Sequence, residues 1–338
     1  MGLIGMNALI HTLTSRRITE LMNSVVGHYV TIYMIHRPRP FDGAYDGVSP
    51  ELLEQCIIYA KQSGFDFVSI DDVITNALTM QKPKRPTLCF TLDDGYQDQL
   101  DQLVPILLKH DCKPTLFVIA DMVDGKDWPW DSKISFAIWN AKKTEIKFTF
   151  GNEQFYFDIS HPNDRRKIRR QLIRYGKSLP ADQLALYCET LLSVLEFSNQ
   201  NDIPSAYKAS TWDSLREAEK AGLRIGSHAC SHRVFSSLPD DQVIAELERA
   251  QTLLSNELRD PSKVFCYPSG TLIDFSMHHT KMVKESNHFI GAVTSMPGNT
   301  NHQQIRKNSF LIKRHSFPEN IEKFIRYSSW LEYIRSKI

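Results

Sequence analysis

The sequence predicts an α/β protein in which strands and helices alternate around a parallel barrel. Short apolar runs alternate with amphipathic segments along most of the chain, and polar motifs follow directly after several of the apolar runs. Repeated units of this kind bury their strands on both faces and place functional loops where the strands end. With 338 residues and 42% hydrophobic content, the chain is long enough to bury the core of one barrel-sized domain.

The first third of the chain shows this alternation clearly. Ser49 before Pro50 is typical of a helix start, and Gly64 of a helix stop. β-Branched and aromatic residues indicate strands, whereas apolar residues three or four apart indicate helices. On these grounds we expect helices at 18–26, 50–62, 70–78 and 98–110, and strands at 29–35, 67–69, 88–92 and 114–119.

Between about residues 122 and 210 the alternation breaks, which indicates an insertion rather than a part of the barrel. A turn is expected at 127–130, a β-hairpin at 146–157, and mostly helical structure at 165–195. The basic run that begins at Arg165 and ends at Arg170 is interpreted as the solvated face of a helix.

From Ser210 onwards the alternation resumes. We expect helices at 211–221, 239–258, 276–285 and 319–336, and strands at 223–225, 264–266, 289–293 and 310–313. The expected domain organisation is therefore an N-terminal helical extension over residues 1–28, followed by one barrel domain over 29–338 that carries the insertion.

Composition and charge exclude several classes of protein. A net charge of +1 does not support binding of nucleic acid. Six scattered cysteines without a Cys-x-x-Cys pair are typical of reduced core cysteines and favour a cytoplasmic location. The first 14 residues are too short and too polar for a signal peptide or a transmembrane segment. Peripheral membrane contact through helix 18–26 is an alternative to its packing on the domain.

The most informative motif is Asp93-Asp94-Gly95, which follows the apolar run 88–92 directly. Neighbouring side chains of an extended segment point to opposite sides, so the two aspartates are expected to have different roles. One could bind a metal while the other handles a proton. The competing interpretation is an ordinary turn, because Asp and Gly are common turn residues.

Two further motifs follow later strands. His228 and His232 lie four residues apart after the apolar segment 223–225, and with a carboxylate they form a set that leaves zinc an open position for water. The stretch 264–270 reads Val-Phe-Cys-Tyr-Pro-Ser-Gly, which is another strand that ends in a Pro/Gly turn.

These three motifs, in this order, resemble those of the polysaccharide deacetylases, carbohydrate esterase family 4. The family patterns are Thr-Phe-Asp-Asp-Gly, His-Ser/Thr-x-x-His and Phe-x-Tyr-Pro-aromatic-Gly. The likeness runs from about Val30 to Arg314 without the insertion. It implies an incomplete, distorted (β/α)7 barrel and a metal-dependent hydrolase that removes an acetyl group from an N-acetylated sugar.

The resemblance also implies roles for individual residues. Asp93 falls on the catalytic base, and Asp94, His228 and His232 fall on the ligands of a divalent metal, preferably Zn²⁺, with Co²⁺, Ni²⁺ or Mn²⁺ as alternatives. The general acid is expected to be His36, which follows a strand end similar to Tyr-His-Arg-Val in some members, or else His315 in a late motif. Residues that fall on the substrate-binding positions are Trp212, Tyr267, Pro268, Ser269 and Arg314.

Three positions depart from the family pattern. Ala229 replaces a Ser or Thr, Cys266 stands where many members have an arginine that holds the base aspartate, and Ser269 stands where an aromatic residue usually borders the substrate. The expected partner is an N-acetylated sugar or oligosaccharide, either a polymer or a nucleotide- or lipid-linked precursor. The alternatives are a deformylase or O-deacetylase acting on a similar sugar, and a sugar-binding barrel without catalysis.

Overall fold

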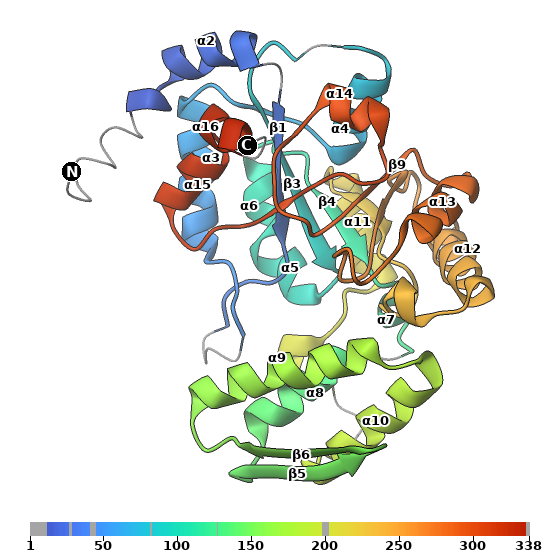
Figure 1. Ribbon diagram of the computed structural model, residues 1–338. Coiled ribbons are helices and arrows are strands. Elements are labelled where there is room, and N and C mark those ends of the chain that lie inside the picture. The colour runs from blue at the N-terminus through green and yellow to red at the C-terminus, as the bar shows by residue number, and fades with distance from the viewer. Residues whose placement is uncertain are drawn as a thin grey trace.

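The centre of the protein is one curled sheet surrounded by helices (Figure 1). The computed structural model describes residues 12–26, 29–40, 45–81, 83–126, 128–197 and 203–335. The strands follow the order β10-β1-β3-β4-β7-β8-β9, with β11 paired to β1 and β2 paired to β3. Neighbouring strands are parallel except β1 and β10. The bounds are β1 Tyr29–Ile35, β2 Asp66–Phe67, β3 Thr87–Asp94, β4 Thr115–Val118, β7 Arg224–Ser227, β8 Val264–Cys266, β9 Gly291–Val293, β10 Thr300–Asn301 and β11 His315–Ser316.

The expected fold class, an α/β protein with a distorted, incomplete (β/α)7 barrel and a mostly helical inserted segment, is confirmed by this architecture. Parallel pairing brings the carboxyl ends of successive strands together: Asp94 lies beside Val118, and Val118 beside Ser227. The sheet therefore has one mouth at which the sequence motifs meet.

Helices of the barrel begin and end largely where local signals predict. The Ser49 hydroxyl accepts a hydrogen bond from the Leu52 N–H at 3.3 Å, and the Thr211 hydroxyl accepts one from Ser214 N–H at 3.1 Å. Each cap satisfies a donor that the first helical turn leaves free. The helices are α2 Arg16–Val26, α3 Pro50–Gln62, α4 Ile70–Leu78, α5 Gln97–Gln102, α6 Val104–Lys109, α7 Ala120–Val123, α11 Trp212–Lys220, α12 Asp240–Glu257, α13 Met277–Glu285, α14 His302–Lys307, α15 Ile321–Tyr327 and α16 Trp330–Arg335.

Side chains of β3 alternate between the two faces of the sheet. Leu88, Phe90 and Leu92 are fully buried in the cluster shared with α3 and α6, whereas Cys89 belongs to the cluster on the opposite face. Each fully buried Leu or Phe contributes about 1.5–3 kcal/mol of stability. The period of two places Asp93 on the same face as Cys89, inside the barrel.

The expected strand 310–313 is not a strand in the structure. Ile312 makes only an isolated bridge to Val293 of β9, and the regular pairing begins at β11, where His315 lies beside Tyr33 of β1. The segment therefore contacts β9 first and pairs with β1 a few residues later, and in this way it spans the gap between the two strands. Between its two contacts, the Arg314 side chain enters the barrel, where it reaches Asp93.

Two expected helices are divided in the structure. The helix at 98–110 becomes α5 and α6, because Pro105 in the first turn of α6 has no N–H for a continuous helix. The helix at 319–336 becomes α15 and α16, and the Ser328 hydroxyl between them forms a 2.7 Å hydrogen bond with the Tyr33 hydroxyl.

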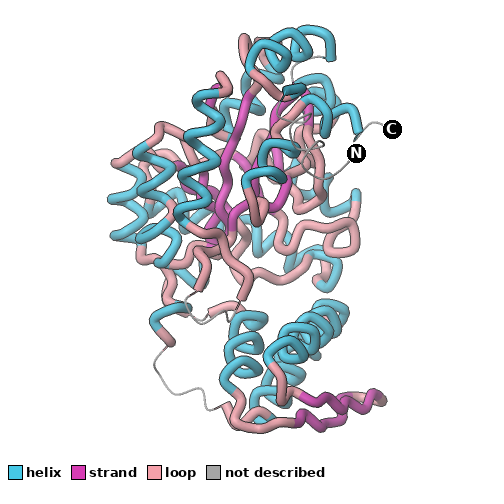
Figure 2. Tube along the Cα trace, turned by 90° about the vertical axis from the view of Figure 1, so that its left-hand side faces the viewer, coloured by secondary structure: helices cyan, strands magenta, loops and turns pink. Residues whose placement is uncertain are grey.

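The inserted segment is a small layer of helices over a hairpin, with its own hydrophobic core. It comprises α8 Trp130–Asn140, β5 Glu145–Phe150, β6 Glu153–Asp158, α9 Pro162–Ser178 and α10 Ala181–Val194. Figure 1 shows that the inserted segment faces the carboxyl ends of the barrel strands, and Figure 2 shows from the side that it forms a layer of its own beside the barrel. Helix α8 was not expected, although Ile134, Ala137 and Ile138 have the apolar spacing of a helix.

The N-terminal helix α2 packs beside α16. Just before it, the Leu13 carbonyl accepts a hydrogen bond from the Trp330 indole at 3.0 Å. Residues 1–11, 27 and 28 of the expected extension lie outside the described residues. Among the helices that the structure describes, none has the length and apolar character that crossing a membrane requires.

Candidate metal and catalytic site

The backbone turns sharply where β3 delivers its two carboxylates to the mouth. Asp94 has φ 86° and Gly95 has φ 92°, and a Cβ on Gly95 would lie 2.9 Å from a methyl carbon of Val118. A side chain at position 95 would therefore be both strained and obstructed. The Gly95 carbonyl is held from the other side by the Ser210 hydroxyl at 2.8 Å.

Asp94, His228 and His232 form a cluster that suits a divalent cation. The Nε2 atoms of His228 and His232 lie 3.7 and 3.8 Å from Asp94 Oδ1, and the candidate ligand atoms all lie within 4.8 Å of one another. Two imidazoles and one carboxylate are a typical catalytic metal set with an open position. The structure thus brings together the three residues expected as ligands.

His228 is prepared for this role by its surroundings. Its Nδ1 lies 2.8 Å from the Cys266 carbonyl, which orients Nε2 toward the cluster. Burial, together with His232, lowers the pKa of His228 to about 4. The imidazole is therefore neutral near pH 7, as metal binding requires.

A second group, Asp93 with His228 and Cys266, also has its polar atoms within 4.8 Å of one another. It is the poorer cation site, because both Asp93 oxygens accept hydrogen bonds from Arg314. Burial also raises the pKa of the Cys266 thiol well above its ordinary value, which disfavours the thiolate.

Asp131, from α8 of the insertion, is a residue that sequence reasoning missed. Its Oδ2 lies 3.8 Å from His232 Nδ1, which is buried and has no hydrogen-bond partner within the described part of the chain. A metal-ligating histidine usually directs its second nitrogen at a carboxylate or carbonyl. No motif surrounds Asp131, so its place could not be read from the sequence.

Asp93 is buried in a bidentate ion pair with Arg314. Both nitrogen–oxygen distances are 2.8 Å, and the exposed fractions of the two side chains are 2% and 1%. Burial by itself would raise the Asp93 pKa, but Arg314, with smaller contributions from His228 and His36, brings that pKa well below its ordinary value. Asp93 is therefore a carboxylate at any pH at which the protein would work.

Arg314 was expected at the substrate, but its guanidinium is enclosed instead. Besides Asp93 it donates to Thr91 Oγ1 and to the Thr294 carbonyl, each at 2.9 Å, and it lies 3.2 Å from Cys266 Sγ. In many family members an arginine at the position of Cys266 is expected to hold the base aspartate. Here Arg314, from the segment that closes the barrel, supplies that positive charge instead.

The residues of the turn at 267–270 differ in what they present to the site. The Tyr267 ring is buried and stacks on Phe275 at 4.0 Å, and its N–H donates to the Val293 carbonyl at 3.3 Å. Pro268 has no N–H. Ser269, with φ 60°, borders a small cavity together with His232 and Asp131. Of the three turn residues expected at the substrate, Ser269 is the one that lines this cavity.

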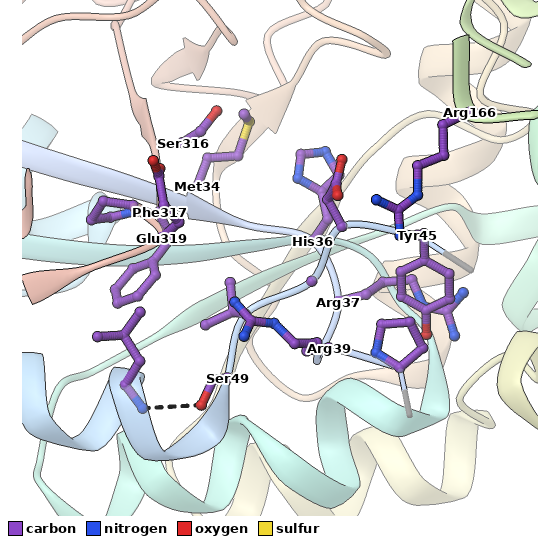
Figure 3. A pocket seen from close by; sticks show the side chains of 16 residues that line it. Met34, His36, Arg37, Arg39, Tyr45, Ser49, Arg166, Ser316, Phe317 and Glu319 are labelled. Atoms are coloured by element: carbon purple, nitrogen blue, oxygen red, sulfur yellow. Dashed lines mark hydrogen bonds between the residues drawn. The ribbon is translucent and has the colours of Figure 1, made fainter. Parts of the chain in front are cut away.

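The structure places the two candidate acids differently. His36 is exposed and lines a cavity of about 820 Å³, where Figure 3 shows its ring between Met34 and Arg166, which reaches in from the insertion. His315 is buried, lies 2.9 Å from Asn299 Oδ1 and stacks on Tyr327 at 4.8 Å. Burial lowers the pKa of His315 to about 4. Only His36 lies at the mouth.

Trp212 is not part of the metal cluster. It begins α11, packs partly against the barrel core, and its indole N–H lies 3.4 Å from Asp124 Oδ1.

Several residues of the site have a left-handed backbone conformation. Asp94, Ala229, His232 and Ser269 have φ values of 86°, 62°, 59° and 60°. Left-handed conformations of residues other than glycine cost free energy and gather where function requires an unusual geometry.

Comparisons with known proteins agree with this geometry. The polysaccharide deacetylase family model matches residues 193–290, which include both histidines and the turn at Tyr267. No curated protein matches the chain.

Several solved structures have a similar fold. The deacetylase PplD from Streptococcus pyogenes, in complex with acetate, has a TM-score of 0.58 and 16% identity over 89% of this chain and 98% of that one. IcaB from Ammonifex degensii has a TM-score of 0.55 and 15% identity over 89% and 97%. A de-N-acetylase from Aggregatibacter actinomycetemcomitans has a TM-score of 0.53 and 13% identity over 88% and 99%. The resemblance to the polysaccharide deacetylases is thereby confirmed.

Proposed function

We propose that the protein is a metal-dependent hydrolase that removes the acetyl group from an N-acetylated sugar. One observation carries the proposal: a candidate metal triad, Asp94, His228 and His232, lies beside a separate, permanently ionised carboxylate, Asp93. Hydrolysis of an amide needs both an electrophilic centre and a proton acceptor. The names of two similar structures, a deacetylase with acetate and a de-N-acetylase, support acetyl as the acyl group.

Asp94, His228 and His232 would hold the cation, preferably Zn²⁺, with Co²⁺, Ni²⁺ or Mn²⁺ as alternatives. When bound, such an ion supplies Lewis acidity toward the acyl carbonyl and the attacking water. Asp93 accepts a proton from the attacking water as the water oxygen bonds to the carbonyl carbon. The Ser269 backbone N–H donates to the oxygen that becomes negative. His36 then protonates the sugar nitrogen as the C–N bond breaks, which yields acetate and an amino sugar.

The direct test is a panel of N-acetylated sugars, offered free, nucleotide-linked, lipid-linked and polymeric, to metal-loaded protein. We expect acetate release from at least one class and none after Asp93→Asn. N-formylated and O-acetylated sugars in the same panel reveal a deformylase or O-deacetylase. Sugar binding without release of any acid would instead identify a non-catalytic sugar-binding barrel.

We also propose a cytoplasmic location, in which a precursor sugar rather than a finished extracellular polymer is the substrate. The support is that all six cysteines are free thiols and five of them are buried. Fractionation of cells tests this, and recovery of the native protein chiefly outside the cytoplasm and inner membrane would reject it.

A further inference from the structure

Helix α9 of the insertion turns a basic face toward the barrel. Its Ile168, Leu172 and Gly176 are buried in the core of the insertion, and Figure 1 shows α9 between that core and the mouth of the barrel. The helix surface that these residues leave uncovered carries five cations, Arg166, Arg169, Arg170, Arg174 and Lys177.

Several of these cations line cavities that also contain residues of the candidate site. Arg166 lines the cavity of His36 (Figure 3), and Lys177 lines the small cavity that contains His232 and Ser269. A further cavity of about 550 Å³ is lined by Arg169, Arg170, Arg174 and Lys177. The basic run was interpreted from sequence as a solvated face, but in the structure much of it borders the mouth.

Few negative charges face Arg169, Arg170 and Arg174. Among the described residues, Asp274 is the only carboxylate that lines the 550 Å³ cavity, and it already accepts hydrogen bonds from the Thr271 N–H and hydroxyl. Asp46 meets Arg170 at 3.3 Å, but both side chains are exposed, so the pair contributes little. Arg165 is different, because its guanidinium donates to backbone carbonyls of the insertion and anchors the helix.

Among these cations, Arg169 has the clearest unsatisfied group. Its Nε is buried and has no hydrogen-bond partner in the described part of the chain. Burial and the adjacent Arg170 lower its pKa, although Asp46 and Asp131 act in the opposite direction. An anion in the cavity would relieve both the desolvation and the repulsion.

We infer that the acylated sugar bound at this mouth carries a phosphate or pyrophosphate group, and that the basic face of α9 holds it. The inference rests on the proposed function and narrows its substrate class. Arginine forks match phosphate oxygens in a bidentate manner, whereas a neutral polymer would offer no negative charge to Arg169. A nucleotide-linked and a polyprenyl-linked sugar both present this chemistry. Ile273, with an exposed fraction of 81%, lines the same cavity, and its neighbour Leu272 is 67% exposed, which suits the lipid form.

The test measures binding with ligands that contain no amide, so that hydrolysis plays no part. Full-length protein, with and without metal, is titrated with UDP-glucose against methyl glucoside, and with vesicles that contain polyprenyl phosphate against polyprenol. We expect the phosphorylated ligand to bind on the order of tenfold more tightly in at least one pair, and the preference to shrink as salt is added.

The double variant Arg169→Gln/Arg170→Gln should lose this preference. Lys167→Gln is the matched control, because Lys167 lies on the same helix and lines none of the cavities above. Ile273→Ser should weaken only the vesicle arm if the source is a lipid. Equal binding of phosphorylated and neutral ligands, or a double variant that behaves like the control, overturns the inference. Absence of acetate release in the activity assay would instead reject the proposed function and leave these binding results intact.

Discussion

The site has a closed layer and an open layer, and the neighbouring aspartates belong one to each. Asp93 is in the closed layer with Arg314, where side-chain exposure is 2% and 1%. Asp94 is in the open layer with His232 and Asp131, where the side chains are 14%, 11% and 22% exposed. His228, with 3% exposure, lies between the layers and contributes to both candidate ligand groups. The same residue type therefore has two environments, because one carboxylate is neutralised by a fixed guanidinium and the other faces two imidazoles that can share a cation with it.

The largest expected effect separates these two carboxylates. Asp93→Asn should lower activity by about 10²–10⁴ while metal content stays near normal, because the amide cannot accept a proton. Asp94→Asn should lose metal and activity together. Metal analysis and acetate release on both variants check this, and retention of full activity by metal-loaded Asp93→Asn would contradict the mechanism.

The closed layer should matter for stability more than the open one. Arg314→Gln leaves a buried carboxylate without its partner, at an expected cost of about 3–5 kcal/mol in the free energy of unfolding. Urea unfolding of metal-free protein measures it. Asp94→Asn is the control, with an expected cost of about 1 kcal/mol or less, because no Lys or Arg in the described part of the chain pairs with Asp94. Similar costs for the two variants would remove the distinction between the layers.

Acidic pH should destabilise the folded protein through the buried His315. Its pKa is about 4 in the folded protein and near 6.5 when unfolded. As the pH falls below about 6.5, the unfolded state binds a proton at this histidine before the folded state does. The free energy of unfolding therefore decreases between about pH 6.5 and pH 4, by roughly 3 kcal/mol in total. His315→Gln should flatten this part of the stability profile, measured on metal-free protein. An unchanged profile would place the acid sensitivity elsewhere.

The two candidate acids extend the comparison to catalysis. His36→Ala should lower turnover by about 10² without loss of metal, because His36 lies at the open mouth. His315→Ala should affect stability and leave the turnover of the folded fraction nearly unchanged. Turnover normalised to folded protein is the measurement, and the opposite ranking would assign the acid to His315.

The smallest expected effect lies at the edge of the open layer. Asp131→Ala should weaken metal binding by about 10–100-fold through the orientation of His232, and Asp131→Asn should restore part of the loss if orientation rather than charge is what matters. Competition with a chelator measures the affinity. Wild-type affinity in Asp131→Ala would show that the insertion does not assist the metal site.

Local sequence patterns predicted the fold in considerable detail. Caps such as Ser49, strand ends such as Asp93-Asp94-Gly95 and the His228/His232 spacing depend on residues close in the chain, so they could be recognised without the fold. Predictions failed where the chain responds to distant partners. The segment around Ile312 has the composition of a strand, yet it crosses from β9 to β1 because the barrel must be spanned there.

The sequence by itself therefore determined the class of barrel, the candidate ligands and the existence of an insertion, because these follow from periodicity and from motifs a few residues long. Only the tertiary structure decided that Arg314 holds Asp93 across 221 residues of chain, that His36 rather than His315 lies at the mouth, and that Asp131 and the basic face of α9 approach the site from the insertion. Each of these depends on which strand ends and helices meet in space. A short motif carries no information about a partner so distant in the chain.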